Sequence, residues 1–179
     1  MEKLLILNPG STSTKVAVYE DEKQLFVESL SHGAEEISKY ENIIDQYNFR
    51  KDVILKALEK HGVDVNILTA IISRGGLLPP IEAGAYEIDE DIVWQLKNAP
   101  QNEHASNLGA VIAYEISKEK GIPSYIYDGV TVDEMIPLTK VAGLPVMKRK
   151  AMGHNLNMRA AAMKYAKENE KSYDDCTLA

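Results

Sequence analysis

The fold of this chain is decided by the stretch Leu4-Leu5-Ile6-Leu7-Asn8-Pro9-Gly10-Ser11-Thr12-Ser13-Thr14-Lys15-Val16-Ala17-Val18-Tyr19. Two apolar runs flank a polar loop that contains Gly10, and this pattern predicts a β-hairpin with hydroxyl groups at its tip. The hydroxyl and amide donors of that loop, beside the ammonium group of Lys15, suit a phosphate group. The loop lacks the spacing of a Walker A motif, and a strand rather than a helix follows it. An ordinary Ser/Thr-rich turn is the alternative interpretation.

The composition of the 179-residue chain, with 45% hydrophobic and 26% charged residues, is that of a globular protein large enough to bury a core. Its formal net charge of −7 argues against nucleic acid as a partner, since Lys148-Arg149-Lys150 is the densest basic run. A single cysteine, Cys176, permits no internal disulfide and fits a reducing compartment. The apolar run before Asn8 is too short for a signal peptide or a membrane span, so we expect a cytoplasmic protein without a membrane partner.

The first part of the chain predicts three strands, a helix and a buried strand. Short turns join the three strands, which should therefore pair as an antiparallel meander. The helix should end at Gly62, and the apolar run after it is typical of a strand buried on both faces. The expected bounds are 3–8, 15–20 and 24–30 for the three strands, 41–61 for the helix and 67–72 for the buried strand.

The second part of the chain predicts more helices and one short strand, at 125–127. A short helix is expected at 89–97, and Ser106 could cap a longer helix that Gly121 ends. A last helix opens at Asn155. Its expected inner side carries Met158, Ala161, Ala162 and Tyr165. This succession of elements predicts an α/β domain, a mixed sheet with helices on its faces.

Polar residues follow several of the predicted strands, at the edge where parallel sheets gather ligands. Asn8 ends the first strand, Ser73-Arg74-Gly75-Gly76 ends the buried strand, and Asp128 ends the short one. Arg74 suits the bidentate clamping of an oxyanion, although an ordinary surface salt bridge is an equally good interpretation. Asp128 could hold a divalent cation or accept a hydrogen bond, and its alternative is an inert Asp-Gly turn.

Two histidines, His104 and His154, lie beside asparagines just before predicted helices. Together with Arg74 and Asp128 they predict a site that stabilises anionic charge. His32 and His61 lack such neighbours and are interpreted as structural. The set favours phosphoryl transfer, in which positioning and charge neutralisation supply most of the catalysis.

Five ordered segments carry a resemblance to a known family: Leu7–Lys15, Ser73–Gly76, Glu103–Ala110, Asp128–Met135 and His154–Ala160. Through them the chain resembles the acetate and butyrate kinase family. This implies a ribonuclease-H-like α/β domain of the actin, Hsp70 and sugar kinase superfold. Its mixed sheet would start with three antiparallel strands and carry helices on both faces. Residues 1–179 would form the amino-terminal domain, with the interdomain region starting near 145–179 and the second nucleotide-binding domain absent.

The resemblance implies a reversible reaction in which ATP and a short-chain carboxylate, butyrate or a branched-chain relative, give ADP and an acyl phosphate. The implied cofactors are ATP and Mg²⁺. The implied phosphate-binding residues are Asn8, Ser11, Ser13 and Lys15, and the implied catalytic residues are Arg74, Asp128 and His154. His104 and Asn107 would support them, Asn8 and Asp128 would serve Mg²⁺, and the substrate pocket would include Gly75, Gly76, Leu77 and Gly153.

Physical chemistry agrees with this assignment, because a carboxylate nucleophile is already ionised at neutral pH and needs no general base. The main obstacle is repulsion between two anions, which cationic groups and Mg²⁺ would offset. The apolar run Leu77-Leu78-Pro79-Pro80 is a poor lining for a polyol and speaks against a sugar kinase.

Two alternatives remain, a non-catalytic half-domain that binds phosphate or carboxylate, and an acetate-kinase-like activity. A missing carboxyl-terminal half could leave this chain inactive alone, and it predicts exposed apolar surface with self-association.

Overall fold

A computed structural model describes residues 1–98 and 103–176 of the chain. The chain divides into two compact units. We call Met1–Pro79 with Ala85–Tyr127 the sheet unit, and Pro80–Gly84 with Asp128–Ala179 the carboxyl-terminal unit.

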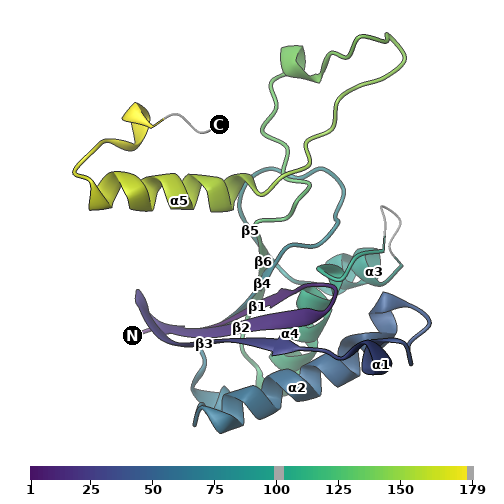
Figure 1. The fold of residues 1–179 in the computed structure, drawn as a ribbon, viewed down its shortest axis with the longest axis vertical. Helices are drawn as coiled ribbons and strands as arrows, with labels where there is room; N and C mark the ends of the chain where they lie inside the picture. The colour runs from purple at the N-terminus through teal and green to yellow at the C-terminus, as the bar shows by residue number, and fades with distance from the viewer. Residues whose placement is uncertain (99–102, 177–179) are drawn as a thin grey trace. The chain divides into compact units, whose positions relative to one another are not determined.

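The sheet unit is built on a six-stranded mixed sheet with the strand order β3-β2-β1-β4-β6-β5 (Figure 1). The strands β1, β2 and β3 are antiparallel, β4 and β6 extend the sheet in parallel with β1, and β5 is antiparallel to β6. The bounds are β1 Lys3–Pro9, β2 Ser13–Glu20, β3 Lys23–Ser31, β4 Ala70–Arg74, β5 Ala85–Glu87 and β6 Ser124–Tyr127.

The predicted meander is confirmed, and the alternation of side chains explains it. Leu5 and Leu7 of β1 and Val16 and Val18 of β2 are fully buried, and such alternation specifies the register of a strand pair. Strand β5 was not predicted, because only three residues form it and they show no apolar pattern.

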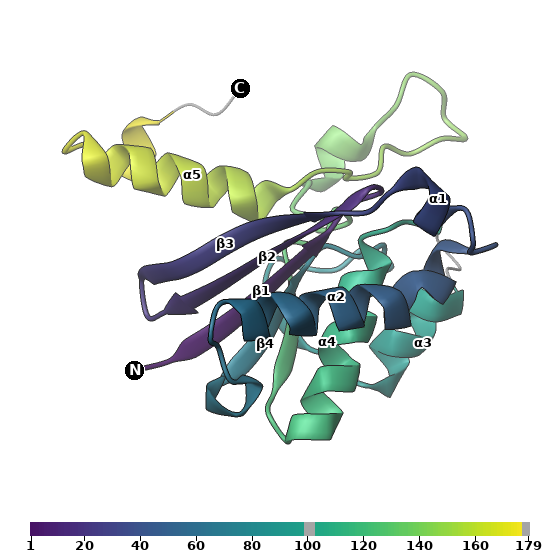
Figure 2. The ribbon, with the colours of Figure 1, turned by 60° about the horizontal axis from the view of Figure 1, so that its bottom comes forward.

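The helices α2 (Tyr47–Lys60) and α4 (Asn107–Lys120) pack side by side on one face of the sheet (Figure 2). Helix α3 (Glu90–Asn98) confirms the helix predicted at 89–97 and packs against α4. The shorter elements of this unit are α1 Ala34–Ile37, η1 Ile43–Gln46 and η2 Val65–Ile67.

The single helix predicted over 41–61 is wrong in its first turn. There the chain forms the separate 3₁₀ helix η1, which Asn42 caps in a reciprocal pair with Asp45. A capping box begins a helix locally, so the chain turns once before α2 starts. Gly62 adopts a positive φ of 67° directly after the last turn, as predicted.

The first turn of α4 lies close to the ends of two strands. A Cβ atom at Gly109 would overlap the hydroxyl of Ser73 and lie 3.0 Å from Pro9 Cδ. Glycine therefore lets the helix approach the ends of β1 and β4 closely. The helix ends at Gly121, whose φ of 68° is left-handed, as predicted.

The carboxyl-terminal unit contains η3 (Pro137–Lys140), α5 (Asn155–Glu168) and η4 (Tyr173–Asp175). Helix α5 buries Leu156, Ala162 and Ala166. The prediction that Met158 and Tyr165 face inward is wrong, since they are 47% and 52% exposed.

Arg159 of α5 pairs with Glu134 of the same unit through two contacts of 2.8 and 2.9 Å, on an exposed side of the helix. Ala161 is also exposed, and of the four predicted inner residues only Ala162 is buried.

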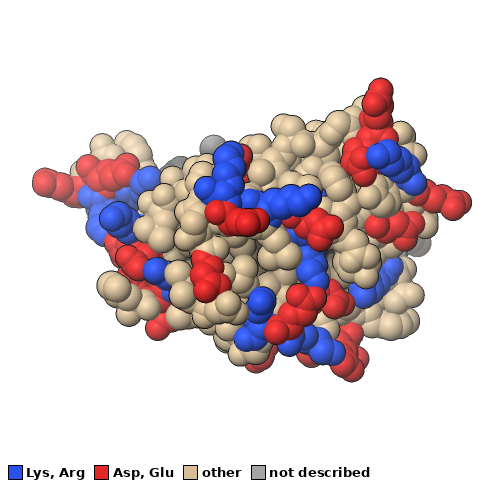
Figure 3. Space-filling model, turned by 90° about the horizontal axis from the view of Figure 1, so that it is seen from below, with Lys and Arg blue, Asp and Glu red and all other residues tan. Residues whose placement is uncertain are grey.

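Charged side chains of both signs are intermixed on the face drawn in Figure 3. Among the ion pairs of the sheet unit, Lys60 and His61 each lie 2.7 Å from the carboxylate of Glu28. No helix in the described part of the chain is both long and apolar enough to cross a membrane.

Candidate functional site

The hairpin tip between β1 and β2 gathers the four residues predicted to bind phosphate. Asn8 and Lys15 are opposite one another in the β1–β2 register. A hydrogen bond of 2.7 Å from the Gly10 amide to the Ser13 carbonyl closes the loop between them. Ser11 and Lys15 are exposed at this tip, where an anion could reach them.

A buried arginine, which was not predicted from the sequence, donates hydrogen bonds to the backbone of this loop. Arg50 of α2 is 0% exposed, and its Nη1 donates to the carbonyls of Gly10 at 2.7 Å and Ser13 at 3.2 Å. Its Nη2 donates to the carbonyl of Ser11 at 2.9 Å. Burial lowers the pKa of Arg50 from its usual value. A buried position of an amphipathic helix normally carries an apolar residue. An arginine at such a position was therefore the signal in the sequence that could have indicated a role for Arg50.

Two further polar residues complete this buried network. Gln46 accepts from Arg50 Nη2 at 2.8 Å and from Nε at 3.1 Å. His32 Nε2 lies 2.9 Å from the hydroxyl of Thr14, the second residue of β2. Burial and repulsion from the Arg50 guanidinium lower the pKa of His32 to about 4. His32 is therefore structural, as predicted, although it contacts the loop that carries the candidate site.

The end of β4 places Arg74 at the same sheet edge as Asn8. Leu7 of β1 is paired with Ser73 of β4 in parallel register, so Asn8 and Arg74 occupy the next positions of the two strands. The start of α4 approaches these strand ends through Gly109. A helix N-terminus carries partial positive charge, so this edge combines several features that favour an anion.

The two glycines after Arg74 are needed for their backbone conformations. Gly75 and Gly76 have φ values of 89° and 116°, which L-residues rarely adopt. A Cβ atom at Gly76 would also lie 2.9 Å from Ile126 Cδ1. The segment can therefore turn sharply at the end of β4 only with glycine at these positions.

Asn107, predicted as a supporting residue, fastens the segment that follows these glycines. Its Oδ1 accepts from the Leu77 amide at 2.9 Å, and its Nδ2 donates to the Leu96 carbonyl at 3.3 Å. Leu77, predicted to line the substrate pocket, is only 8% exposed. Most of the Leu77 side chain therefore serves the core.

His104 forms a local structure before α4. Its Nδ1 accepts from the Ser106 amide at 3.2 Å and lies 2.8 Å from the Ser106 hydroxyl. Because the amide can only donate, Nδ1 carries no proton and a proton resides on Nε2. Ser106 is the N-cap residue of α4, as predicted, but its hydroxyl contacts His104 and makes no capping hydrogen bond.

In the carboxyl-terminal unit, Asp128 and His154 form a close pair. His154 Nδ1 lies 3.1 Å from Asp128 Oδ2 and 2.9 Å from the Asp128 carbonyl. Both partners are acceptors, so Nδ1 must donate and Nε2 is the nitrogen left for a ligand. Asp128 is 2% exposed and adopts a φ of 56°. Its unusual backbone and its burial both serve this pairing.

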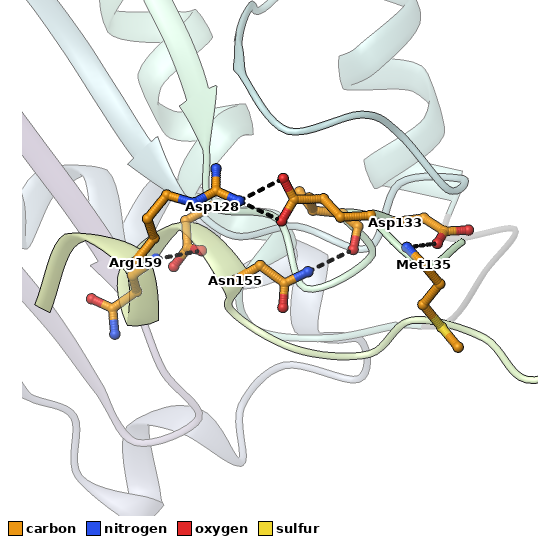
Figure 4. A network of polar contacts seen from close by, with 8 residues as sticks. Asp128, Asp133, Met135, Asn155 and Arg159 are labelled. Carbon is orange, nitrogen blue, oxygen red and sulfur yellow. Dashed lines mark hydrogen bonds and ion pairs between the residues drawn. The ribbon is translucent and has the colours of Figure 1, made fainter. Parts of the chain in front are cut away.

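Asp128 also caps α5. Its Oδ1 accepts from the Asn157 amide in the first turn of the helix at 3.2 Å (Figure 4). Nearby, Asn155 Nδ2 donates to the Val132 carbonyl at 3.4 Å. The Gly153 amide donates to the Val130 carbonyl at 2.8 Å. These bonds fix the segment that carries His154.

A neighbouring carboxylate, Asp133, has a structural role in the same unit. It accepts from the Met135 amide at 3.0 Å (Figure 4) and pairs with Lys140 at 2.6 Å. The hydrogen bonds from Lys140 and Met135 hold the pKa of Asp133 below its usual value. The loop that follows β6 is thereby closed on itself.

The two predicted magnesium ligands, Asn8 and Asp128, carry oxygen atoms of the kind that Mg²⁺ prefers. The described residues contain no cluster of three or more histidine, cysteine, aspartate or glutamate side chains that could hold a metal. Both carboxylate oxygens of Asp128 already have partners within its unit. The assignment of Asn8 and Asp128 to Mg²⁺ stays a prediction.

The structure therefore brings the predicted residues together in two groups. The sheet unit contains Asn8, Lys15, Arg74, His104, Asn107 and the hairpin-tip segment with Ser11 and Ser13, which we call the hydroxyl loop. Asp128, Gly153 and His154 belong to the carboxyl-terminal unit.

Comparison with known proteins supplies a strong sequence match. The chain is 49% identical over 178 residues to butyrate kinase 1 of Clostridium acetobutylicum, covering 99% of this chain and 50% of that protein. The chain resembles half of a butyrate kinase. It is also 48% identical over 176 residues to a probable butyrate kinase of Clostridium botulinum strain Eklund 17B, covering 98% of this chain and 50% of the relative. The match is consistent with an amino-terminal half. No family model matches the chain.

Solved structures show the same fold. The acetate kinase of Porphyromonas gingivalis superposes with a TM-score of 0.65 at 19% identity, over 97% of this chain and 50% of that one. A propionate kinase of Francisella tularensis superposes with a TM-score of 0.60 at 16% identity, over 96% of this chain and 50% of that one. The predicted ribonuclease-H-like α/β fold is confirmed. The chain spans about half the length of the curated relatives that it matches, 50% in each case.

Proposed function

We propose that the protein takes part in reversible phosphoryl transfer from ATP to a short-chain carboxylate, butyrate or a branched-chain relative. The products would be ADP and an acyl phosphate. The observation that carries this proposal is the 49% identity to a butyrate kinase across nearly the whole chain. The gathering of Asn8, the hydroxyl loop and Arg74 at one sheet edge gives that likeness a physical basis.

In the proposed reaction the sheet unit binds the two anions. The hydroxyls of Ser11 and Ser13 and the ammonium group of Lys15 would hold the transferring phosphate. The guanidinium of Arg74 would bind the carboxylate in a bidentate manner. Magnesium bound with ATP would neutralise phosphate charge. The carboxylate, with a pKa of about 4 to 5, attacks without a general base at neutral pH.

In the carboxyl-terminal unit, Asp128 would position His154 for the same reaction. Because Nδ1 donates to Asp128, Nε2 is the nitrogen that can meet a phosphoryl oxygen. With both nitrogens protonated, Nε2–H would donate to an equatorial oxygen of the phosphoryl group during its transfer. Negative charge is spread over these oxygens in the transition state. Asp128 would then act as a positioning residue for His154.

Trapping with hydroxylamine tests the proposal. The chain is incubated with butyrate, MgATP and hydroxylamine, alone and with the carboxyl-terminal half of the butyrate kinase of Clostridium acetobutylicum. We expect hydroxamate in the mixture, a loss of most of it with Arg74→Ala, and no loss with the exposed Arg149→Ala as the control. No hydroxamate in either sample, while the intact relative gives product, contradicts the proposal and leaves the non-catalytic half-domain.

Gly153 tests the finer assignment of butyrate over acetate. A Cβ atom there has only Asn155 Oδ1 within reach, at 3.7 Å, so its own unit can accept a side chain. In the complete enzyme, Gly153→Phe should fill space beside His154 and shift the ratio of kcat/KM values from butyrate toward acetate. Gly143, which has nothing within 4 Å of a Cβ, provides the control variant Gly143→Phe. An unchanged ratio in Gly153→Phe would count against the predicted pocket.

A further inference from the structure

The guanidinium of Arg50 makes an unusual set of contacts beneath the hairpin tip. It donates to the carbonyls of Gly10, Ser11 and Ser13, and also to the hydroxyl of Thr14 at 3.2 Å. All these acceptors belong to the hairpin tip, which consists of the loop and the first two residues of β2 and holds the predicted phosphate-binding hydroxyls. One side chain of α2 thus fixes almost every peptide of the loop.

The direction of these bonds determines where the loop amides point. In a trans peptide the carbonyl and the next amide point in opposite directions, and the described chain contains no cis peptide. The Gly10 and Ser11 carbonyls face Arg50, so the amides of Ser11 and Thr12 face away from it. Ser11 and Thr12 are also exposed. Arg50 therefore turns amide donors toward the side where an anion would approach.

The charge of Arg50 has no counter-ion in the described part of the chain. Its partners are the loop oxygens and the Gln46 side chain, all of them neutral. A buried charge without a carboxylate is costly, and proteins rarely keep one that serves packing alone. The cost becomes understandable when an anion binds on the far side of the loop.

We propose that Arg50 is a positioning residue that holds the hairpin-tip loop in its anion-binding conformation. Its charge also adds positive electrostatic potential, from the side of the loop opposite the anion. The inference rests on the proposed function, because it assigns the anion as a phosphate group. Gln46 takes part in this positioning, since it accepts hydrogen bonds from Nε and Nη2 of Arg50 and so orients the guanidinium. Arg50 does not itself touch the anion.

The test compares substitutions that separate charge, geometry and packing. Arg50→Lys keeps the charge but loses the planar fork that reaches several carbonyls, and Arg50→Met keeps only the approximate volume. Leu58→Ala, in the same helix, removes a fully buried side chain that has no part in the hydrogen bonds of the loop. Should Arg50→Met fail to fold, Gln46→Leu releases the guanidinium from a residue outside the loop.

The first measurement is amide hydrogen exchange of the full 179-residue chain in the absence of ligand. We expect the protection of the Gly10 amide, which donates to Ser13, to fall about tenfold or more in Arg50→Lys, Arg50→Met and Gln46→Leu. Leu58→Ala should lower protection in the core without this selective loss at the tip. Wild-type protection of the tip in Arg50→Lys overturns the inference and leaves the proposed function untouched.

The second measurement is a titration with inorganic phosphate, followed through the amide shifts of Ser11 and Thr12. We expect the dissociation constant to rise about tenfold in Arg50→Lys and further in Arg50→Met, which also lacks the charge. An unchanged constant in both variants overturns the inference. No phosphate-dependent shift at the tip of the wild-type chain contradicts instead the phosphate site of the proposed function, and with it the anion assigned to Arg50.

Discussion

Gly76 shows how strongly a single position can be constrained beside the candidate site. Its φ of 116° is in a region that L-residues rarely adopt, and a Cβ atom would lie 2.9 Å from Ile126 Cδ1. Strain and crowding should together lower the free energy of unfolding of Gly76→Ala by about 2–4 kcal/mol, measured by urea denaturation. Gly143→Ala, where the added methyl meets open space, should change it by less than about 0.5 kcal/mol. Equal stability of the two variants would contradict this account.

His32 makes the stability of the sheet unit depend on pH. Burial and repulsion from Arg50 lower the pKa of its imidazole from 6.5 to about 4. Below pH 6.5 the unfolded chain binds a proton that the folded protein excludes, so stability is lost as the pH falls from 6.5 toward 4. The contribution of this one group should reach about 3 kcal/mol at the acid end.

The variant His32→Gln isolates that contribution, because glutamine keeps a polar group near Thr14 but does not titrate. Free energies of unfolding of the wild type and the variant are compared between pH 7.5 and about 4.5. The advantage of the wild type should shrink as the pH falls and be constant above pH 7. A difference that stays the same at every pH would show that the folded imidazole titrates normally.

At the scale of elements, helix α5 depends on a residue outside it. Asp128 follows β6 directly in the chain, caps the Asn157 amide at 3.2 Å and holds the Nδ1–H of His154. Loss of the cap in Asp128→Ala should destabilise the chain by about 1–2 kcal/mol and raise hydrogen exchange at Asn157.

A spectroscopic readout separates this capping from the positioning of His154. The ¹⁵N shifts of the neutral imidazole should show the proton on Nδ1 in the wild type and a shift toward Nε2 in Asp128→Ala. Ser172→Ala is a matched control, since its hydroxyl accepts from the Asp174 amide and so caps η4 in the same unit. An unchanged tautomer in Asp128→Ala would refute the positioning role.

At the scale of the whole molecule, exposed apolar side chains gather in one segment of the carboxyl-terminal unit. Ile136, Leu138, Val146 and Met147 are 61%, 77%, 91% and 59% exposed. Soluble monomers rarely display contiguous apolar patches of this kind. We predict that the chain self-associates, so that its weight-average mass in sedimentation equilibrium rises with concentration.

Charge substitutions can locate the association. Leu138→Glu combined with Val146→Glu should lower the mass toward that of a monomer. Ile67→Glu, at a site 47% exposed in the sheet unit, should leave it unchanged. A wild-type chain that sediments as a monomer at every concentration would rule the prediction out.

The sequence by itself determined the elements whose patterns are local. The hairpin and the meander follow from alternation, α4 follows from helical periodicity, and the ends of α2 and α4 follow from Gly62 and Gly121. It also placed Asn8 and Arg74 at one edge, because parallel neighbours share their carboxyl ends. The family resemblance indicated the fold before any contact was known.

Only the tertiary structure decided which distant side chains meet. Arg50 reaches the hairpin loop because α2 packs near β2, and Arg159 of α5 meets Glu134 only in the folded unit. No spacing along the chain encodes these contacts, since their free energy arises from groups that are neighbours only after the helices have docked. Local patterns fix where an element begins and ends, whereas burial and hydrogen bonding across elements fix what each polar side chain does.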